Sequence, residues 1–170
     1  MKRLILLMLG LLALLAALFL ELPQPGQPAL TQDVEKIVID KSDRLMQVYA
    51  DGRAVKTYAV ALGFAPDGDK ARQGDGRTPE GTFRVDRRNG QSRYHLSLGL
   101  DYPQPEDRAR ADAGGYDPGG DIFIHGQPRG IAAGMKLAGD WTAGCIAVSN
   151  AEIEELFAHV ALGTLVEIRP

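Results

Sequence analysis

The chain has 170 residues, of which 45% are apolar and 24% are charged, and these proportions are typical of one globular domain and exclude a disordered chain. Its formal net charge is -3 at neutral pH, so the sequence predicts no nucleic-acid partner. Its 20 glycines and 10 prolines favour a turn-rich, strand-rich fold over a helical bundle.

Residues 1–20 are predicted to be a signal peptide or an N-terminal membrane anchor. Lys2 and Arg3 precede a nearly continuous apolar run over residues 4–20, and residues 17–21 contain no typical small-residue cleavage site. The run just reaches the length that spans a bilayer. We therefore expect an exported domain in the periplasm or cell envelope, anchored in the inner membrane if the leader is retained, with this segment as its only membrane contact.

Residues 21–32 are expected to form a linker, because they are rich in proline and lack a periodic apolar pattern. The folded domain is then expected over residues 33–170. Runs of β-branched and aromatic residues predict strands in its first half, at residues 36–40, 44–50, 54–62, 82–86 and 94–100. Asp51 and Gly52 are a strong hairpin signal between the second and third of these strands.

The second half of the domain contains long loops. Residues 101–120 are too long for a simple connection, and such loops are often functional. A short buried strand is expected at residues 121–125, and another loop then leads to residues 141–148. The one helix that the pattern predicts follows, and a closing strand is expected at residues 164–168.

The predicted helix begins after residue 148. Ser149 and Glu152 have the spacing of a capping box, and Gly163 is expected to end the helix. Four apolar residues fall on one helical face, namely Ile153, Leu156, Phe157 and Val160.

Cys145 is the one cysteine of the chain and the candidate nucleophile. Outside the cytoplasm it has no intramolecular partner, so it is either a packed, inert side chain or a reactive thiol. Thr142, Ala143 and Gly144 place small residues before it, which lets a substrate backbone approach and lets amide N–H groups face a developing oxyanion. This context favours the reactive thiol.

His125 is the candidate base. It ends an apolar strand and precedes Gly126, a position suited to projecting an imidazole into a cleft, although a structural hydrogen-bonding role is the alternative. A base must draw the proton from a thiol before the sulfur attacks. His95 is the rival candidate, expected to be structural or to line the cleft, and His159 is expected to compensate the dipole of the terminal helix.

Other chemistries lack their motifs. The three histidines and one cysteine do not have the spacing of a zinc site, so we predict no metal and no cofactor. Residues 74–81 fit no phosphate loop, and the chain contains neither GxSxG nor C-x-x-C.

Several motifs together resemble one family. Ile124-His125-Gly126, Gly144-Cys145-Ile146 and the segment Gly76–Phe83 are similar to the signature elements of the L,D-transpeptidase (YkuD-type) catalytic domain, and the resemblance extends over about residues 36–170. It implies a mainly β fold, a β-sandwich of mixed sheets with a C-terminal helix and long loops. It also implies a thioacyl-enzyme on Cys145, proton transfer by His125, and oxyanion N–H groups from Gly144 and Cys145.

The chain departs from the family pattern at two positions. The common motif is Ser-His-Gly-Cys-x-Arg, whereas residues 142–147 are Thr-Ala-Gly-Cys-Ile-Ala, so the second histidine and the arginine are absent. The segment 141–150 resembles a branch that hydrolyses as well as transfers. Arg77 or Arg129 is the candidate to pair with a substrate carboxylate instead, the alternative being a solvated loop charge. The further candidate substrate-binding residues are Trp141, Thr142, Gly126 and Gly144.

The resemblance therefore predicts an L,D-transpeptidase of peptidoglycan, in which Cys145 attacks a stem tetrapeptide and an amine resolves the thioester. The acceptor amine is on a second stem peptide or on a wall-linked protein. An L,D-carboxypeptidase or amidase acting on the same class of bond is the first alternative. A non-catalytic wall-binding module is the second.

Overall fold

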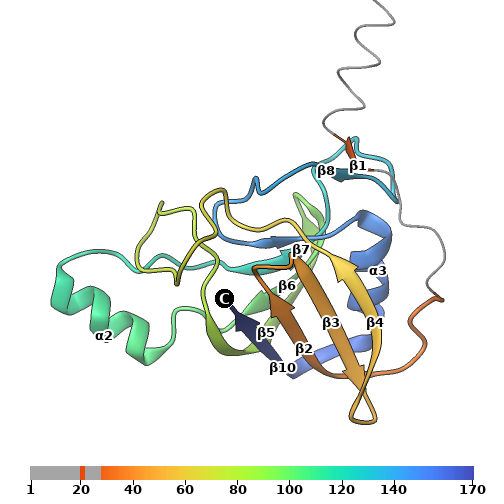
Figure 1. The fold of residues 1–170 in the computed structure, drawn as a ribbon, viewed down its shortest axis with the longest axis horizontal. Coiled ribbons are helices and arrows are strands. Elements are labelled where there is room, and N and C mark those ends of the chain that lie inside the picture. Colours follow the sequence, from red (N-terminus) through yellow and green to blue (C-terminus); the bar gives the residue numbers. More distant parts are fainter. Residues whose placement is uncertain (1–19, 22–27) are drawn as a thin grey trace, which may run out of the picture.

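The computed structural model describes residues 20–21 and 28–170 (Figure 1). The predicted leader, residue 20 excepted, and residues 22–27 of the predicted linker lie outside the described residues. No helix among those described is long and apolar enough to cross a membrane. Leu30, which the sequence placed in the linker, has a side chain only 6% exposed and packs in the core.

Eight strands form one curled, mixed sheet in the order β4-β3-β2-β10-β5-β6-β7-β9 (Figure 1). Their bounds are β2 Val34–Asp40, β3 Leu45–Ala50, β4 Arg53–Ala59, β5 Gly81–Ser92, β6 His95–Leu100, β7 Phe123–His125, β9 Ile146–Ala147 and β10 Val160–Arg169. A separate pair joins β1 Leu20–Glu21 to β8 Lys136–Leu137. The predicted mainly β fold with mixed pairing and a C-terminal helix is confirmed.

The C-terminal strand β10 lies in the middle of the sheet. It pairs in parallel with β2 and antiparallel with β5, so it joins the N-terminal hairpins to the strands that carry the candidate site. The two edges of the sheet also meet, because Ala61 bridges to Ala147 and Gly63 bridges to Thr142. The sheet therefore curls almost into a closed barrel around its apolar side chains.

The predicted N-terminal strands and their hairpin are confirmed. β3 and β4 pair antiparallel, and the turn between them has positive φ at Asp51 (50°) and Gly52 (69°), the geometry of a type I′ turn. β-branched side chains are buried along β2, where Ile37 and Ile39 are fully buried and Val38 between them is also buried.

Helix α3, Asn150–His159, begins where the capping box predicted. The Ser149 hydroxyl accepts the Glu152 N–H at 3.2 Å, and the Glu152 carboxylate accepts the Ser149 N–H at 2.7 Å. The predicted stop at Gly163 is wrong, since the helix ends at His159 and β10 follows at once. Gly163 has a φ of 86° within β10, where the register shifts and only glycine is unstrained.

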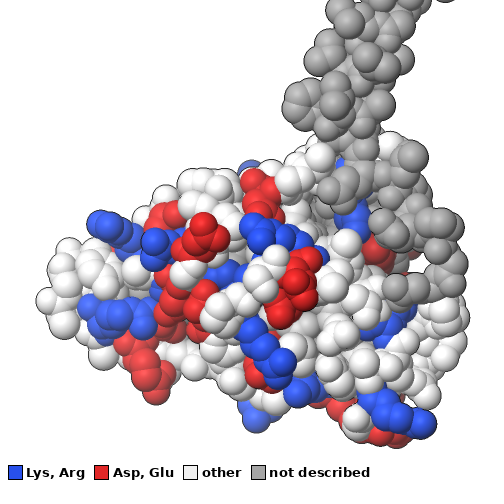
Figure 2. Space-filling view, viewed as in Figure 1, with Lys and Arg blue, Asp and Glu red and all other residues white. Residues whose placement is uncertain are grey.

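A second helix, α2 at Pro105–Gly114, lies within the segment predicted to be a loop. Only Ala111 among its residues is buried, so the helix has no apolar face for a periodicity to reveal. The sequence does contain the signals for its two ends, because Pro105 begins the helix and Gly115 ends it in the left-handed conformation. α2 projects at the left of Figure 1, and Figure 2 shows acidic and basic side chains mixed over that end.

The core beneath the candidate site is sensitive to cavities. Leu98 of β6 is fully buried and lies opposite Ile124 of β7, whereas Leu162 of β10 is 61% exposed. We expect Leu98→Ala to lower the free energy of unfolding by about 2–5 kcal/mol. Urea unfolding followed by circular dichroism measures this loss. Leu162→Ala is the matched control, and an equal loss in both variants would contradict this assignment of the core.

Candidate active site

The sheet brings Cys145 and His125 to one cavity. β7 and β9 pair in parallel, with Ile124 beside Ile146 and His125 beside Ala147, and Cys145 is the residue before β9. A cavity of about 320 Å³ opens over them. Its lining residues are Asn89, Ser92, Arg93, Tyr94, Ser97, Asp121, Phe123, His125 and Cys145.

The imidazole of His125 is held in one tautomer. Its Nδ1 lies 2.7 Å from the carbonyl oxygen of Gly126, and because a carbonyl only accepts hydrogen bonds, Nδ1 carries the proton. Nε2 is then left with its lone pair. The side chain is buried, and burial lowers the pKa of His125 against a smaller opposite effect of the Gly126 carbonyl, so the ring is neutral at neutral pH. These are the properties of a base.

Two aromatic rings fix the plane of the His125 imidazole. Tyr94 stacks on it with centroids 4.5 Å apart, and Trp141 meets it edge-on at 5.8 Å. The Tyr94 and Trp141 rings are themselves 5.9 Å apart, so the three form one cluster. Trp141, a predicted site residue, thus contacts the candidate base, although it does not line the cavity. Its Nε1 is buried and has no hydrogen-bond partner among the described residues.

Gly126 is required by close packing, and its φ lies outside the left-handed region. A Cβ on it would lie 2.6 Å from the Asn150 side-chain oxygen and 2.9 Å from the Tyr94 carbonyl oxygen. Its N–H is shared between the carbonyls of Tyr94 and Leu96, at 3.1 and 3.2 Å. The residue after the candidate base is therefore locked to strand β6, which keeps the Gly126 carbonyl facing Nδ1.

The Cys145 thiol is a protonated group in the resting structure. Burial raises its pKa, and the Asp121 carboxylate raises it further, whereas the Phe123 N–H, Lys70 and Arg87 act in the opposite direction. Its Sγ lies 3.4 Å from the backbone oxygen of Asp121, which accepts the thiol proton. Thiolate formation here therefore depends on a nearby base.

Thr142 organises the segment that carries Cys145. Its buried hydroxyl donates to the Cys145 carbonyl at 2.7 Å and accepts the Gly144 N–H at 3.1 Å. The Gly144 N–H therefore donates to Thr142 in this arrangement, and the oxyanion role of the Gly144 and Cys145 N–H groups stays a prediction. Gly144 has a φ of 134°, and a Cβ there would lie 2.6 Å from the Arg77 carbonyl oxygen.

Neither predicted arginine lines the cavity. The Arg77 guanidinium donates to the Asp69 carbonyl at 3.2 Å, within its own loop. Arg129 is exposed and lines a neighbouring polar cleft together with Gln127 and His95. The arginine that does line the cavity is Arg93, which the sequence analysis missed together with Tyr94 and Asp121.

The other two histidines are placed away from the cavity. His95 has a φ of 69°, and its Nε2 lies 2.6 Å from the Glu154 carboxylate on α3, so it ties the β5–β6 hairpin to the helix. His159 ends α3, as predicted, and its Nδ1 lies 3.7 Å from the Asp33 carboxylate. No cluster of three potential metal-binding side chains occurs within residues 28–170.

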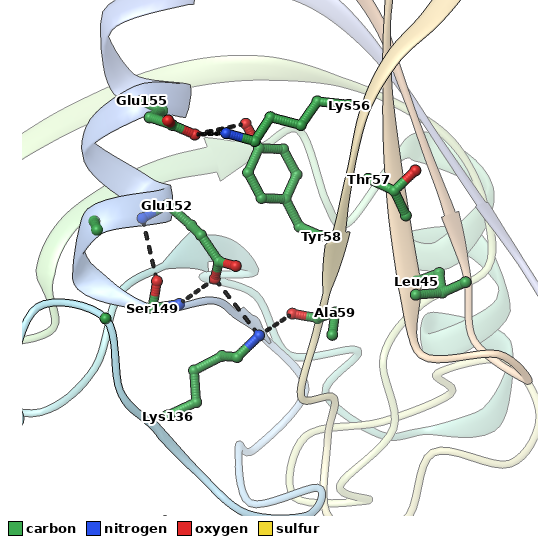
Figure 3. Close-up of a pocket in the computed structure, with 11 residues that line it drawn as sticks. Leu45, Lys56, Thr57, Tyr58, Ala59, Lys136, Ser149, Glu152 and Glu155 are labelled. Atoms are coloured by element: carbon green, nitrogen blue, oxygen red, sulfur yellow. Dashed lines mark hydrogen bonds and ion pairs between the residues drawn. The ribbon is translucent and has the colours of Figure 1, made fainter. Parts of the chain in front are cut away.

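A second cavity of about 380 Å³ lies between β4 and α3 (Figure 3). Its charged groups are paired with one another. Lys56 contacts Glu155 at 2.6 Å, and Lys136 donates to the Ala59 carbonyl at 2.9 Å and lies 3.6 Å from Glu152. None of the residues predicted to form the site lines this cavity. Its charged side chains instead connect the edge of the sheet to the helix.

Comparison with known proteins places this arrangement in a family. Residues 35–168 match the family described as the L,D-transpeptidase catalytic domain, YkuD. Because the match covers most of its length, the chain belongs to that family. The resemblance noted in the sequence is thereby confirmed.

The relatives are longer proteins. The chain is 30% identical over 140 residues to the candidate L,D-transpeptidase YafK of Escherichia coli K12, covering 79% of this chain and 50% of that protein. It is 28% identical over 152 residues to the candidate L,D-transpeptidase YqjB of Bacillus subtilis, covering 87% of this chain and 74% of that protein. The chain thus spans about half the length of YafK and about three quarters of YqjB.

Solved structures share the fold. The helical cell shape determining protein Pgp2 of Campylobacter jejuni has a TM-score of 0.63 at 25% identity, over 86% of this chain and 52% of that one. L,D-transpeptidase 1 of Mycobacterium tuberculosis has a TM-score of 0.51 at 15% identity, over 81% of this chain and 62% of that one. The second likeness concerns the fold alone.

The Thr142 hydroxyl supports the nucleophile segment. In Thr142→Val the buried Gly144 N–H and the Cys145 carbonyl lose their partner, so we expect the unfolding free energy to fall by about 1–3 kcal/mol. We also expect slower alkylation of Cys145 as the segment shifts. Urea unfolding and mass-spectrometric alkylation rates measure both effects. Thr142→Ser keeps the hydroxyl, and a Ser variant as damaged as the Val variant would refute this role.

The Asp121 carboxylate is expected to suppress thiolate formation. Because it raises the pKa of Cys145, Asp121→Asn should shift the pH profile of iodoacetamide alkylation to lower pH. The direction follows because a lower thiol pKa populates the reactive thiolate at lower pH. Asparagine also tolerates the φ of 54° at this position. An unchanged profile, equal to that of the exposed control Asp43→Asn, would contradict the electrostatic effect.

Proposed function

We propose that this domain is a peptidoglycan L,D-transpeptidase that works through a thioacyl-enzyme on Cys145, with His125 as base and acid. The observation that carries the proposal is the fixed tautomer of His125. Its Nδ1–H donates to the Gly126 carbonyl, which leaves Nε2 unprotonated in the cavity that also holds the one cysteine of the chain. Membership of the family supports the choice of peptide substrate.

The first half of the reaction transfers an acyl group to sulfur. Nε2 of His125 takes the thiol proton, and the sulfur attacks the carbonyl carbon of the third residue of a stem tetrapeptide. The carbon–nitrogen bond to D-Ala then breaks, and the imidazolium returns its proton to the leaving nitrogen. A thioester on Cys145 and free D-Ala result. The neutral, buried imidazole suits both steps, because it is a base before the attack and an acid after it.

The second half resolves the thioester. An amine of a second stem peptide, or of a wall-linked protein, gives a proton to His125 and attacks the thioester carbon. The sulfur leaves and regains the proton. Water in place of the amine yields the hydrolytic reaction of an L,D-carboxypeptidase, or of an amidase if the bond cleaved joins a wall-linked protein.

One observation favours the hydrolytic alternative. The family motif has a second histidine and an arginine at the positions of Ala143 and Ala147 in this chain. Ala147 is fully buried, and its N–H and C=O are both bonded to Ala61, so no side chain from it enters the cavity. Among the described residues the cavity therefore has one imidazole. An amine that arrives as an ammonium ion must lose a proton before it can attack and finds no second base, whereas water arrives neutral.

We also propose that the reaction takes place outside the cytoplasm. The charged and apolar pattern of residues 1–20 supports export, and peptidoglycan lies on that side of the inner membrane. Pgp2 is named as a protein that determines helical cell shape. Because the cell wall determines shape, that function is of the same class as a reaction on peptidoglycan.

Incubation of the reduced protein with a disaccharide-tetrapeptide tests the proposal. We expect cross-linked dimer or tripeptide in mass spectra, with both products lost in Cys145→Ala and reduced about 10²- to 10⁴-fold in His125→Gln. Dimer identifies transfer and tripeptide alone identifies hydrolysis. Unchanged substrate with intact, reduced Cys145, or full activity in Cys145→Ala, would overturn the proposal and favour a wall-binding module.

A further inference from the structure

We propose that Arg93 binds the free carboxylate of the amino acid that leaves during acylation of Cys145. This inference rests on the proposed function and goes beyond it, because it defines the class of donor and of acceptor. Donors would end in a free α-carboxylate directly after the scissile bond. Acceptors would be amines that carry a carboxylate on the neighbouring carbon.

Arg93 is the one fixed positive charge that lines the cavity over Cys145. It is exposed, and its guanidinium has no hydrogen bond or ion pair within the described part of the chain. Arg87, which does not line the cavity, differs, since it is paired with Asp86 at 3.0 Å and with Asp121 at 3.2 Å. An unpaired guanidinium offers two parallel N–H donors to a carboxylate.

The base of the Arg93 side chain is held rigidly. Its neighbour Tyr94 stacks on His125, and the Tyr94 N–H donates to the Ser92 hydroxyl at 3.1 Å. The Tyr94 carbonyl accepts the Gly126 N–H, and His95 is tied to Glu154. The hairpin end is therefore fixed on both sides of Arg93, while the guanidinium itself is free to meet a ligand.

The proposed proton transfer from His125 to the leaving nitrogen indicates which substrate group lies near Arg93. His125 must protonate the leaving nitrogen, so the leaving amino acid lies against the imidazole. Its α-carboxylate is two bonds from that nitrogen, and Arg93 directly precedes Tyr94, the ring stacked on the imidazole, along the cavity wall. The Asp121 carboxylate does not compete for Arg93, because Arg87 holds it.

This placement separates two kinds of peptide bond. When the leaving group is a terminal amino acid, its carboxylate is charged and Arg93 binds it. When the leaving group is an interior residue or the side-chain amine of a protein, that position holds a neutral amide or no group, and the interaction is lost. The acceptor enters where the leaving group departed, so the same preference applies to it. The geometry thus favours removal or exchange of a terminal residue over cleavage within a chain.

A pair of donors isolates the carboxylate. A disaccharide-tetrapeptide with a free C-terminus is compared with the same compound ending in a carboxamide, and kcat/KM is measured for each. We expect the wild-type protein to prefer the free acid by about tenfold, the size of one charge-assisted hydrogen-bonded pair at a partly exposed site. In Arg93→Gln this preference should fall to near one, and Arg93→Lys should restore part of it.

Two further arginines serve as comparisons. Arg53→Gln, at the first residue of β4, should keep the full preference, because Arg53 does not line the cavity and the sheet closes near Cys145 through Ala61, beyond the opposite end of β4. Arg129→Gln tests the neighbouring cleft. The inference is overturned if Arg93→Gln keeps the preference, if Arg129→Gln removes it instead, or if the wild-type protein makes Cys145-dependent product from both donors equally.

A second measurement needs no peptide substrate. The rates at which Cys145 reacts with anionic dithiobis(nitrobenzoate) and with neutral dithiodipyridine are compared in the wild-type, Arg93→Gln and Arg53→Gln proteins. We expect the anionic-to-neutral rate ratio to fall several-fold only in Arg93→Gln, and the difference to shrink in high salt. If the protein is inactive on both donors but the anionic-to-neutral rate ratio still falls only in Arg93→Gln, the proposed function fails while the anion site stands. An unchanged ratio refutes the site itself.

Discussion

The two-residue strand β9 is the constraint on which the candidate site depends. It pairs in parallel with β7 on one side, and on the other side Ala147 exchanges backbone hydrogen bonds with Ala61 in both directions. The same pairings close the curled sheet and set Cys145 beside the strand that ends in His125. A change in the curvature of the sheet would therefore separate the thiol from the imidazole, even though neither side chain had changed.

Electrostatics divides the labour between the two groups. Burial disfavours charge on both, raising the pKa of the Cys145 thiol and lowering that of the His125 imidazole. The resting pair is therefore neutral, and in the proposed reaction an ion pair forms only when proton transfer is coupled to attack on a substrate. The Gly126 carbonyl fixes which nitrogen takes part, and the hydroxyl of Thr142 fixes the backbone on either side of the sulfur.

The hairpin β5–β6 links this pair to the substrate. Tyr94 packs on the candidate base, and Arg93 beside it presents the free charge of the cavity. In a chain whose motif lacks the arginine of its family, this hairpin provides the arginine that we propose to bind a substrate carboxylate.

The sequence by itself determined the local structure and indicated the candidate reacting residues. Runs of β-branched and aromatic residues, Asp51-Gly52 and the Ser149–Glu152 capping box predicted the first strands, their turn and the start of α3, because each depends on neighbours along the chain. A lone Cys145 after small residues and a His-Gly at a strand end pointed to the candidate pair.

Tertiary structure alone decided the rest. Helix α2 buries only Ala111, so no periodicity marked it, and the position of β10 between β2 and β5 is set by pairing over long distances in sequence. Which arginine faces the cavity, and whether the Gly144 N–H is free, depend on how loops far apart in the chain pack together. The pattern of side chains along the sequence indicates whether a segment is a helix or a strand. The neighbours of a loop residue, in contrast, are fixed only when the curled sheet brings distant segments into contact.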